Sequence, residues 1–271
     1  MTPTEKTQPN AKSGTQVDRR QAILLPMAFT AALGAAVYWG PRQSLAYQPL
    51  QGLTPFRQLI SDGTHSTGSV ALLGMNESAA GSTDADLGQR VAEVRADLCG
   101  ALFGTGFGDE RKTPLAYFTD VNCPNCRILE HGLASVMARD PTGLHLVRHE
   151  LPLLGPASVI AARALLAAET QGRREDLAKR LTRASFVTDE AFMGALAESL
   201  GIDVHRMLID MKSPPVEAHL RTSQALARIF GLAGVPALFV GRTLIVGAVP
   251  GYTISRVVDD ERAMPTMVCP A

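Results

Sequence analysis

The spacing of apolar positions changes along the chain in a way that predicts strands and helices in turn. Residues 115–119 form an unbroken run of strand formers, and the apolar positions after them recur on one helical face up to about Arg139. A turn over 140–143 leads into a second predicted strand over 144–151. A strand, a helix and a second strand in this order predict parallel pairing with a right-handed crossover.

The second half of the chain carries a long helical pattern in which Gly and Pro mark the helix ends. Helices are expected over about 156–172, 173–184, 188–201, 203–211 and 214–231. Thr188 suits the N-cap of the third of these helices. Strand character then returns in a hairpin of 237–240 and 243–246, and a last helix spans about 252–262. The pattern predicts an α/β fold that contains a block of helices.

The N-terminal part of the chain has the pattern of a membrane segment. Residues 1–20 are polar and end in two arginines, whereas residues 22–39 carry no charge. At about 1.5 Å per residue, the uncharged stretch would span roughly 27 Å, close to the hydrocarbon thickness of a bilayer. We expect a cytoplasmic tail over 1–20 and a transmembrane anchor or signal segment over 21–40, with Ser44-Leu45-Ala46 as a weak cleavage candidate. Either form places the rest of the chain at a periplasmic or extracytoplasmic location.

The segment between the membrane pattern and the first clear strand is the least regular part of the chain. Residues 41–112 are rich in Gly, Ser, Thr and Asp, with a helical pattern only over about 84–98. We interpret this segment as a tether and an N-terminal extension. The main domain is expected over 113–262, followed by a C-terminal tail over 263–271.

Composition narrows the choice of partners. Of the 271 residues, 46% are hydrophobic, which is enough for a substantial core, and the formal net charge is zero. The chain has no basic patch, and aromatic residues make up only 5% of it. These features argue against nucleic acid as a partner.

The most informative motif is Cys123-Pro124-Asn125-Cys126, which lies where a predicted strand passes into a predicted helix. Backbone N–H groups at a helix N-terminus favour an anion, so a thiol placed there loses its proton more readily. Pro124 suits the first helical position, where no N–H is needed. Two sulfurs on one helical turn can close into a small disulfide and open again. The motif therefore predicts redox chemistry that needs no cofactor.

A zinc site is the main alternative for this motif, since a Cys-x-x-Cys pair is often half of one. Such a site needs two further ligands, and the other cysteines, Cys99 and Cys269, are isolated and far apart in the sequence. The one close pair of histidines, His145 and His149, lies in a predicted strand. We therefore expect no metal, and a purely structural cysteine pair without turnover stays open as another alternative.

Cys99 and Cys269 lie outside the predicted domain, one before it and one after it. In an oxidising compartment, two leftover cysteines can pair, which would join the N-terminal extension to the C-terminal tail. A disulfide, two free buried thiols and bonds to other chains all remain open, because the sequence does not give the distance between the two residues.

Three segments of the chain, in their order and spacing, resemble the DsbA-like branch of the thioredoxin family. They are residues 118–126, which end in Cys-Pro-Asn-Cys, residues 151–158, Leu-Pro-Leu-Leu-Gly-Pro-Ala-Ser, and residues 234–240, Gly-Val-Pro-Ala-Leu-Phe-Val. The resemblance covers about 113–262 and implies a thioredoxin-like fold with a helical insertion over about 156–231. It also implies a cis peptide bond before Pro236, beside the cysteines, so that the backbone of Val235 can pair with an extended substrate segment.

The resemblance further implies a protein thiol–disulfide oxidoreductase. Its Cys123–Cys126 disulfide would oxidise cysteine pairs in exported proteins, and a membrane quinone-linked partner would restore it. Cys123 is expected to form the mixed disulfide with substrate, because its sulfur should be the more exposed of the two. Two alternatives remain: a reductase or isomerase in a haem-attachment or disulfide-repair pathway, and a non-catalytic membrane-tethered chaperone.

The chain departs from the family pattern next to the cysteines. Many relatives carry a buried acid six residues before the first cysteine, where this chain has Tyr117. The oxidase archetype has a histidine where this chain has Asn125, which is uncharged but can donate a hydrogen bond. We therefore expect the pKa of Cys123 to be depressed, but not to an extreme value. Asp120 is expected either to influence this thiol or to form a cap or turn.

Overall fold

The computed structural model describes residues 44–61, 63, 66–67, 84–104, 107–108, 111–183 and 189–269. The expected cytoplasmic tail and membrane segment, residues 1–20 and 21–40, lie outside these ranges. In the part of the chain that the structure describes, no helix combines the length and the apolar character needed to cross a bilayer.

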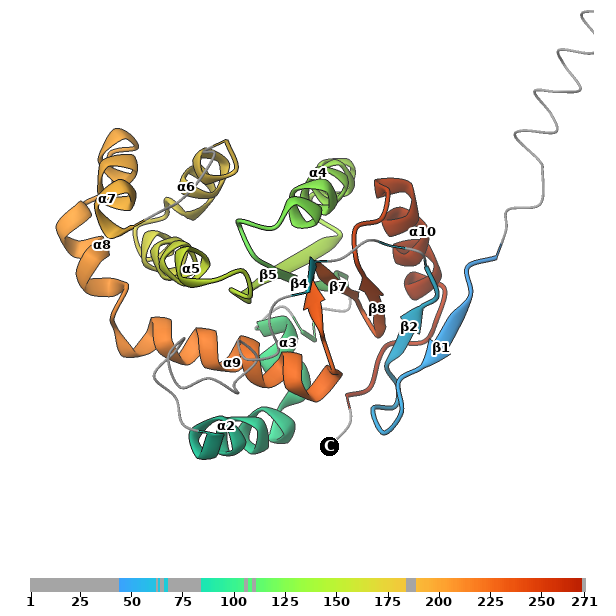
Figure 1. The fold of residues 1–271 in the computed structure, drawn as a ribbon. Coiled ribbons are helices and arrows are strands. Elements are labelled where there is room, and N and C mark those ends of the chain that lie inside the picture. The colour runs from blue at the N-terminus through green and yellow to red at the C-terminus, as the bar shows by residue number, and fades with distance from the viewer. Residues whose placement is uncertain are drawn as a thin grey trace, which may run out of the picture. The chain divides into compact units, whose positions relative to one another are not determined.

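The centre of the fold is a sheet of six strands (Figure 1). In chain order they are β1 (Tyr47–Pro49), β2 (Arg57–Leu59), β4 (Thr113–Thr119), β5 (Leu144–Glu150), β7 (Ala237–Val240) and β8 (Thr243–Val246). Their order across the sheet is β1-β2-β8-β7-β4-β5. The pairs β4–β5 and β2–β8 are parallel, and the others are antiparallel. The predicted strand–helix–strand unit and the predicted hairpin are both confirmed.

Strands β1 and β2 lie within residues 41–112, which the sequence analysis interpreted as a tether and an N-terminal extension. β2 pairs with β8, and Phe56 just before it is buried, with its ring edge-on to those of Phe230 and Phe239. Three-residue strands are too short to show an alternating pattern, so only their pairing with distant residues makes them strands.

Helices cover both faces of the sheet, as the apolar run in β4 requires. Leu115 and Tyr117 pack with α4 (Pro124–Arg139) and α10 (Gly251–Arg262) on one face. Ala116 and Phe118 pack with helices α2, α3 and α9 on the other face (Figure 1). These three helices span Asp84–Ala96, Leu98–Phe103 and Pro214–Phe230.

Helices α4 and α10 approach closely where Gly132 faces Gly251. A Cβ atom added at Gly132 would lie 3.1 Å from the backbone nitrogen of Gly251, and one added at Gly251 would lie 3.0 Å from the backbone oxygen of Gly132. The two backbones are therefore in contact, and neither position has room for a side chain.

The helical insertion consists of α5 (Pro156–Glu169), α6 (Arg174–Leu181), α7 (Glu190–Ser199), α8 (Val204–Asp210) and α9. Helices α5 to α8 enclose an apolar core of their own, which includes Leu165, Leu177, Met193 and Met207. The N-cap of α7 is Asp189, whose carboxylate accepts a hydrogen bond from Phe192 N at 2.8 Å. The predicted cap, Thr188, lies outside the described residues.

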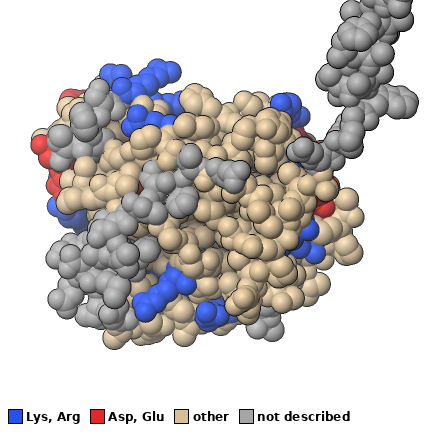
Figure 2. All heavy atoms as spheres, turned by 45° about the vertical axis from the view of Figure 1, so that its right-hand side comes forward, with Lys and Arg blue, Asp and Glu red and all other residues tan. Residues whose placement is uncertain are grey.

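A second, two-stranded sheet joins distant parts of the chain. It consists of β3 (Ser66–Thr67) and β6 (Gly234–Val235) in antiparallel pairing. On the face shown in Figure 2, the coloured Lys and Arg side chains lie in separate groups among uncharged residues and form no continuous basic surface.

Candidate redox site

Cys123 is the N-cap residue of α4, and Pro124 is the first residue of the helix, as predicted. The sulfur of Cys123 accepts a hydrogen bond from the backbone N–H of Cys126 at 3.2 Å. It therefore occupies the place that a serine or aspartate oxygen takes in an ordinary helix cap. A negative charge on this sulfur is stabilised by that N–H group and by the positive end of the helix dipole.

Asp120 fixes the loop that carries Cys123. Its buried carboxylate accepts hydrogen bonds from the backbone N–H groups of Asn122, Leu153 and Leu154 at 2.9–3.0 Å, and from the Ser158 hydroxyl at 2.8 Å. These contacts tie the end of β4 to the start of the helical insertion. Of the two roles expected for Asp120, the structure gives it the turn-forming one.

Val235 and Pro236 lie beside Cys123, although they are more than 110 residues later in the chain. The thiol of Cys123 donates to the backbone oxygen of Val235 at 3.6 Å. The peptide bond between Val235 and Pro236 is cis, and the oxygen of Pro236 accepts a hydrogen bond from Gly247 N at 2.8 Å. The structure thus brings together the Cys-Pro-Asn-Cys and Gly-Val-Pro segments that the sequence analysis singled out.

Cys126 lies on the first turn of the same helix and is also buried. Burial raises the pKa of its thiol well above the ordinary range, and the neighbouring Cys123 raises it further. The hydroxyl of Tyr117, which lies on β4, donates a hydrogen bond to the backbone oxygen of Cys126 at 2.9 Å. Burial also raises the pKa of Tyr117, so this side chain stays protonated and supports the first turn of α4.

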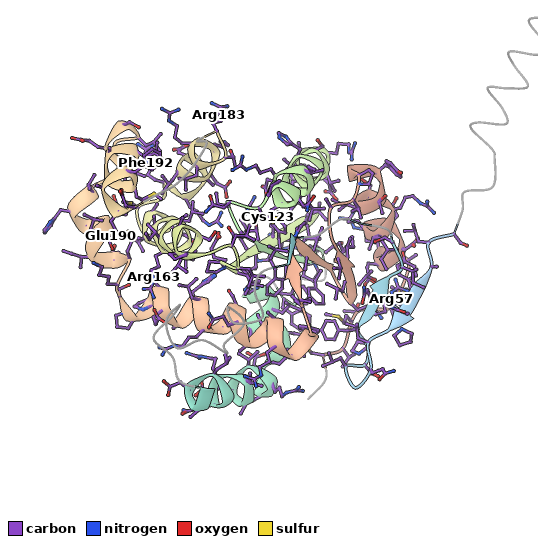
Figure 3. The ribbon with its side chains drawn as sticks, viewed as in Figure 1. Arg57, Cys123, Arg163, Arg183, Glu190 and Phe192 are labelled. Atoms are coloured by element: carbon purple, nitrogen blue, oxygen red, sulfur yellow. A yellow bond between two sulfur atoms is a disulfide. The ribbon has the colours of Figure 1, made fainter. Side chains whose placement is uncertain are left out.

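The expectation that Cys123 is the more exposed cysteine is wrong for this structure. Cys123 is 0% exposed and Cys126 is 3% exposed, and the two sulfurs are not joined in a disulfide. In Figure 3, Cys123 lies where the central sheet meets the helical insertion. The sequence shows the motif, but it does not show which distant residues pack over it.

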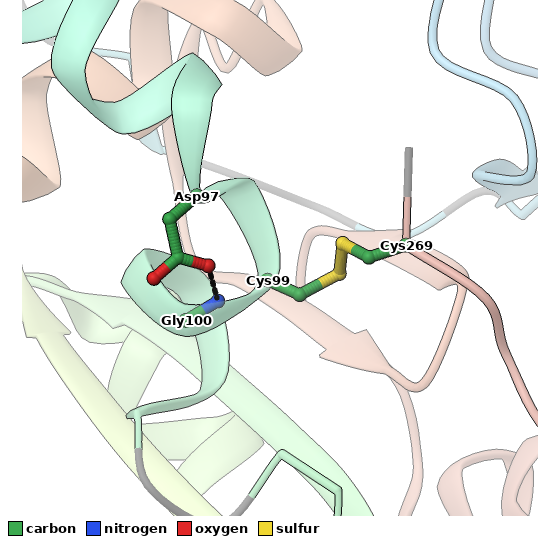
Figure 4. Close-up of a disulfide and its surroundings, with 4 residues drawn as sticks. All are labelled: Asp97, Cys99, Gly100 and Cys269. Atoms are coloured by element: carbon green, nitrogen blue, oxygen red, sulfur yellow. Dashed lines mark hydrogen bonds between the residues drawn. A yellow bond between two sulfur atoms is a disulfide. The ribbon is translucent and has the colours of Figure 1, made fainter. Parts of the chain in front are cut away.

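Cys99 and Cys269 are joined by a disulfide with a Cα–Cα distance of 6.1 Å (Figure 4). The predicted helix over 84–98 in fact ends at Ala96, and Asp97 caps a new helix, α3, by accepting a hydrogen bond from Gly100 N at 3.0 Å. This break directs Cys99 toward the C-terminal segment. Of the outcomes left open for the two cysteines, the structure has the intramolecular pair.

A buried polar pair at the end of β5 was not predicted from the sequence. His149 stacks on Phe118 at 4.7 Å, and its Nε2 lies 2.9 Å from the backbone oxygen of Leu102. Glu150 pairs with Thr119 across the sheet and binds Arg174 of α6. The sequence feature that could have indicated this pair is two consecutive polar residues at the end of a predicted strand. That strand was expected to pair with the one that leads to Cys123.

Burial shifts the pKa values of this pair in opposite directions. It lowers the pKa of His149 to about 4, because the imidazolium form loses its hydration. It raises the pKa of Glu150 to about 7, although the Arg174 guanidinium acts in the other direction. In the described part of the chain, no three His, Cys, Asp or Glu side chains form a group that could hold a metal ion.

We expect the two residues to make opposite contributions to the pH dependence of stability. Between about pH 4 and 6.5 the unfolded chain binds the extra proton at His149, so stability is lost as the pH falls through this window. Between about pH 4.5 and 7 the folded chain binds the extra proton at Glu150, so stability is lost as the pH rises. Relative to wild type, the free energy of unfolding of His149→Gln should fall with rising pH. That of Glu150→Gln should rise, each change by up to about 3 kcal/mol.

Urea unfolding followed by circular dichroism at half-unit pH intervals measures both curves. His131→Gln provides the matched control, because it removes a histidine that is exposed rather than buried. Curves for the two variants that run parallel to wild type would contradict the prediction.

Comparison with known proteins identifies relatives of this fold and site. The sequence model of a family described as the DSBA-like thioredoxin domain matches residues 115–258. The structure is similar to that of a thioredoxin-like oxidoreductase from Silicibacter pomeroyi DSS-3, with 31% identity, a TM-score of 0.55, and coverage of 61% of this chain and 98% of that one. No curated protein matches the chain.

Two further solved structures support the fold alone. The thiol-disulfide exchange protein alpha-DsbA2 from Wolbachia pipientis is 22% identical, with a TM-score of 0.54 and coverage of 66% of this chain and 99% of that one. The catalytic domain of Proteus mirabilis ScsC is 23% identical, with a TM-score of 0.53 and coverage of 65% and 98%.

Proposed function

The chain belongs to the DSBA-like thioredoxin family of thiol–disulfide oxidoreductases, and from this premise we propose that it oxidises cysteine pairs of exported proteins through a Cys123–Cys126 disulfide. A location outside the cytosol is supported by the uncharged segment over 22–39 and by the Cys99–Cys269 disulfide. Residues 21–40 would act as an anchor or export signal.

The observation that carries the proposal is the hydrogen bond from Cys126 N–H to the sulfur of Cys123. This contact, at the N-terminus of α4, favours the thiolate form of Cys123 and therefore stabilises the reduced protein. A pair whose reduced form is stabilised is a stronger oxidant when it is a disulfide. The direction of electron flow that we propose, from client to enzyme, follows from this.

The exchange proceeds in two steps. A client thiolate attacks the sulfur of Cys123, the Cys123–Cys126 bond breaks, and Cys126 leaves with the electron pair and takes up a proton. The second client thiolate then attacks its partner sulfur in the mixed disulfide and releases Cys123 as a thiolate. The client has lost two electrons and the enzyme has gained them. The raised pKa of Cys126 favours its protonated form after the first step.

A membrane quinone-linked partner would accept these two electrons and restore the disulfide. The reduced form of Cys123 and Cys126, without a bond between the two sulfurs, is the form that such a partner would oxidise. During exchange, the backbone of Val235, next to the Cys123 sulfur, would pair with an extended client segment.

The equilibrium of the Cys123–Cys126 couple with glutathione tests the direction. We expect a reduction potential above about −200 mV, in the range of oxidases and isomerases. A potential below about −250 mV would contradict the oxidase and favour the reductase alternative. The double variant Cys123→Ser/Cys126→Ser, which retains the Cys99–Cys269 pair, is the control and should show no transition in this range.

A further inference from the structure

The backbone edge at Val235 is already occupied by another part of the same chain. In the antiparallel pair of β3 and β6, Ser66 faces Val235 and Thr67 faces Gly234. The oxygen of Val235 also accepts the hydrogen bond from the Cys123 thiol. The segment that contains β3 therefore pairs with the residue whose carbonyl contacts the reactive sulfur.

Gly63 holds this segment against the molecule at a second point. A Cβ atom added at Gly63 would lie 2.7 Å from the oxygen of Val246 and 3.3 Å from that of Ala248. A side chain at this position would therefore collide with the backbone at the end of β8. Gly247 lies between these two residues in the chain, and its backbone N–H donates a hydrogen bond to the oxygen of Pro236. The contact at Gly63 and the pairing of β3 therefore both lie close to the Val235–Pro236 peptide bond.

The segment is also tethered closely at its start. β2 pairs with β8 in the central sheet, and only residues 60–65 lie between β2 and β3. A tether of this length keeps β3 at an effective concentration in the millimolar range. An extended client that pairs with the same edge would have to compete with β3 at this effective concentration.

We propose that strand β3 competes with extended clients for the backbone edge at Val235. A client must then displace β3 from this edge before the client thiolate reaches Cys123. This inference rests on the proposed function, because it concerns the same edge. Cys123 is fully buried, and its chemistry requires access to that sulfur, so part of the chain has to move before a client thiolate reaches it. The exchange is then limited to clients whose segment pairs with Val235 strongly enough to replace Ser66 and Thr67.

Two variants that weaken the segment test the proposal. Gly63→Ala places a methyl group against the oxygen of Val246, whereas Gly88→Ala is a matched control, because a Cβ at Gly88 in α2 meets nothing within 4 Å. The double variant Ser66→Pro/Thr67→Pro removes the backbone N–H groups of β3 by a different route. Circular dichroism establishes that each variant is folded.

The readout is the rate at which iodoacetamide alkylates Cys123 in the reduced native protein, assigned by peptide mapping. A segment that occupies the edge about 90% of the time lowers the apparent rate about tenfold. We therefore expect both segment variants to react about five to ten times faster than wild type and Gly88→Ala. The KM for a dithiol peptide should fall by a similar factor, with kcat unchanged.

Wild-type alkylation rates in folded forms of both segment variants would overturn the proposal. A third measurement covers the case in which neither variant folds. In a Cys126→Ser protein loaded with a cysteine peptide on Cys123, amide exchange at Ser66 and Thr67 should speed up at least about fivefold, and unchanged protection would also overturn it. Alkylation does not depend on turnover, so its result is independent of whether the proposed oxidase activity is found.

Discussion

Replacing Cys123 with serine is expected to lower the rate of dithiol peptide oxidation by about 10³-fold or more, because a hydroxyl oxygen cannot form the mixed disulfide. Replacing Cys126 has a different expected result. Cys123 remains at the helix N-terminus, where Cys126 N–H stabilises its charge. The Cys123 thiolate can still attack a client disulfide and release one client thiolate, but the protein has lost the Cys126 sulfur that would attack Cys123 and reverse this step. Cys126→Ser should therefore accumulate covalent complexes with client proteins.

Non-reducing electrophoresis and mass spectrometry of Cys126→Ser recovered from the cell envelope measure these complexes. The control adds Cys123→Ser to the same protein, which leaves only Cys99 and Cys269 and should remove the complexes. If the complexes persist in the control, or if Cys123→Ser alone retains wild-type turnover, Cys123 is not the sulfur that bonds to clients.

The second large effect is expected from loss of the Cys99–Cys269 disulfide. This bond joins α3 to the C-terminal segment across a sequence separation of 170 residues. Closing so long a loop restricts the unfolded chain, and breaking the bond should lower the free energy of unfolding by about 3–5 kcal/mol. We expect this loss for Cys269→Ser, in which the buried Cys99 remains as a small apolar side chain.

Urea unfolding of Cys269→Ser and of its neighbour variant Val268→Ser measures the effect. Val268 is 81% exposed, so Val268→Ser should stay within about 0.5 kcal/mol of wild type. A Cys269→Ser protein as stable as Val268→Ser would show that the bond contributes little to the fold.

Much of the fold could be predicted from the sequence because its elements have strong local signals. Pro124, Pro156 and Pro214 each mark the first residue of a helix, and the hairpin of β7 and β8 has the predicted bounds. The three segments that resemble the DsbA-like branch also contain the residues that meet at Cys123. Local patterns were sufficient wherever an element's own residues determine its start and end.

The remaining features depend on contacts between distant residues. β1, β2 and β3 are two or three residues long and exist only through their partners. The sequence does not give the distance between Cys99 and Cys269, so it could not decide their pairing. The burial of Cys123, His149 and Glu150 likewise depends on what packs over them. These are the points at which the sequence analysis was incomplete or, for Cys123, wrong.

The backbone contact between Gly132 and Gly251 bears on how firmly the two cysteines are held. It fixes the middle of α4 against α10, because a shift of the whole helix would bring two main chains into collision. Asp120 holds the loop just ahead of the same helix through four hydrogen bonds. The helix that carries the cysteines is therefore anchored both in its middle and at its tip, which gives the two sulfurs a rigid mounting.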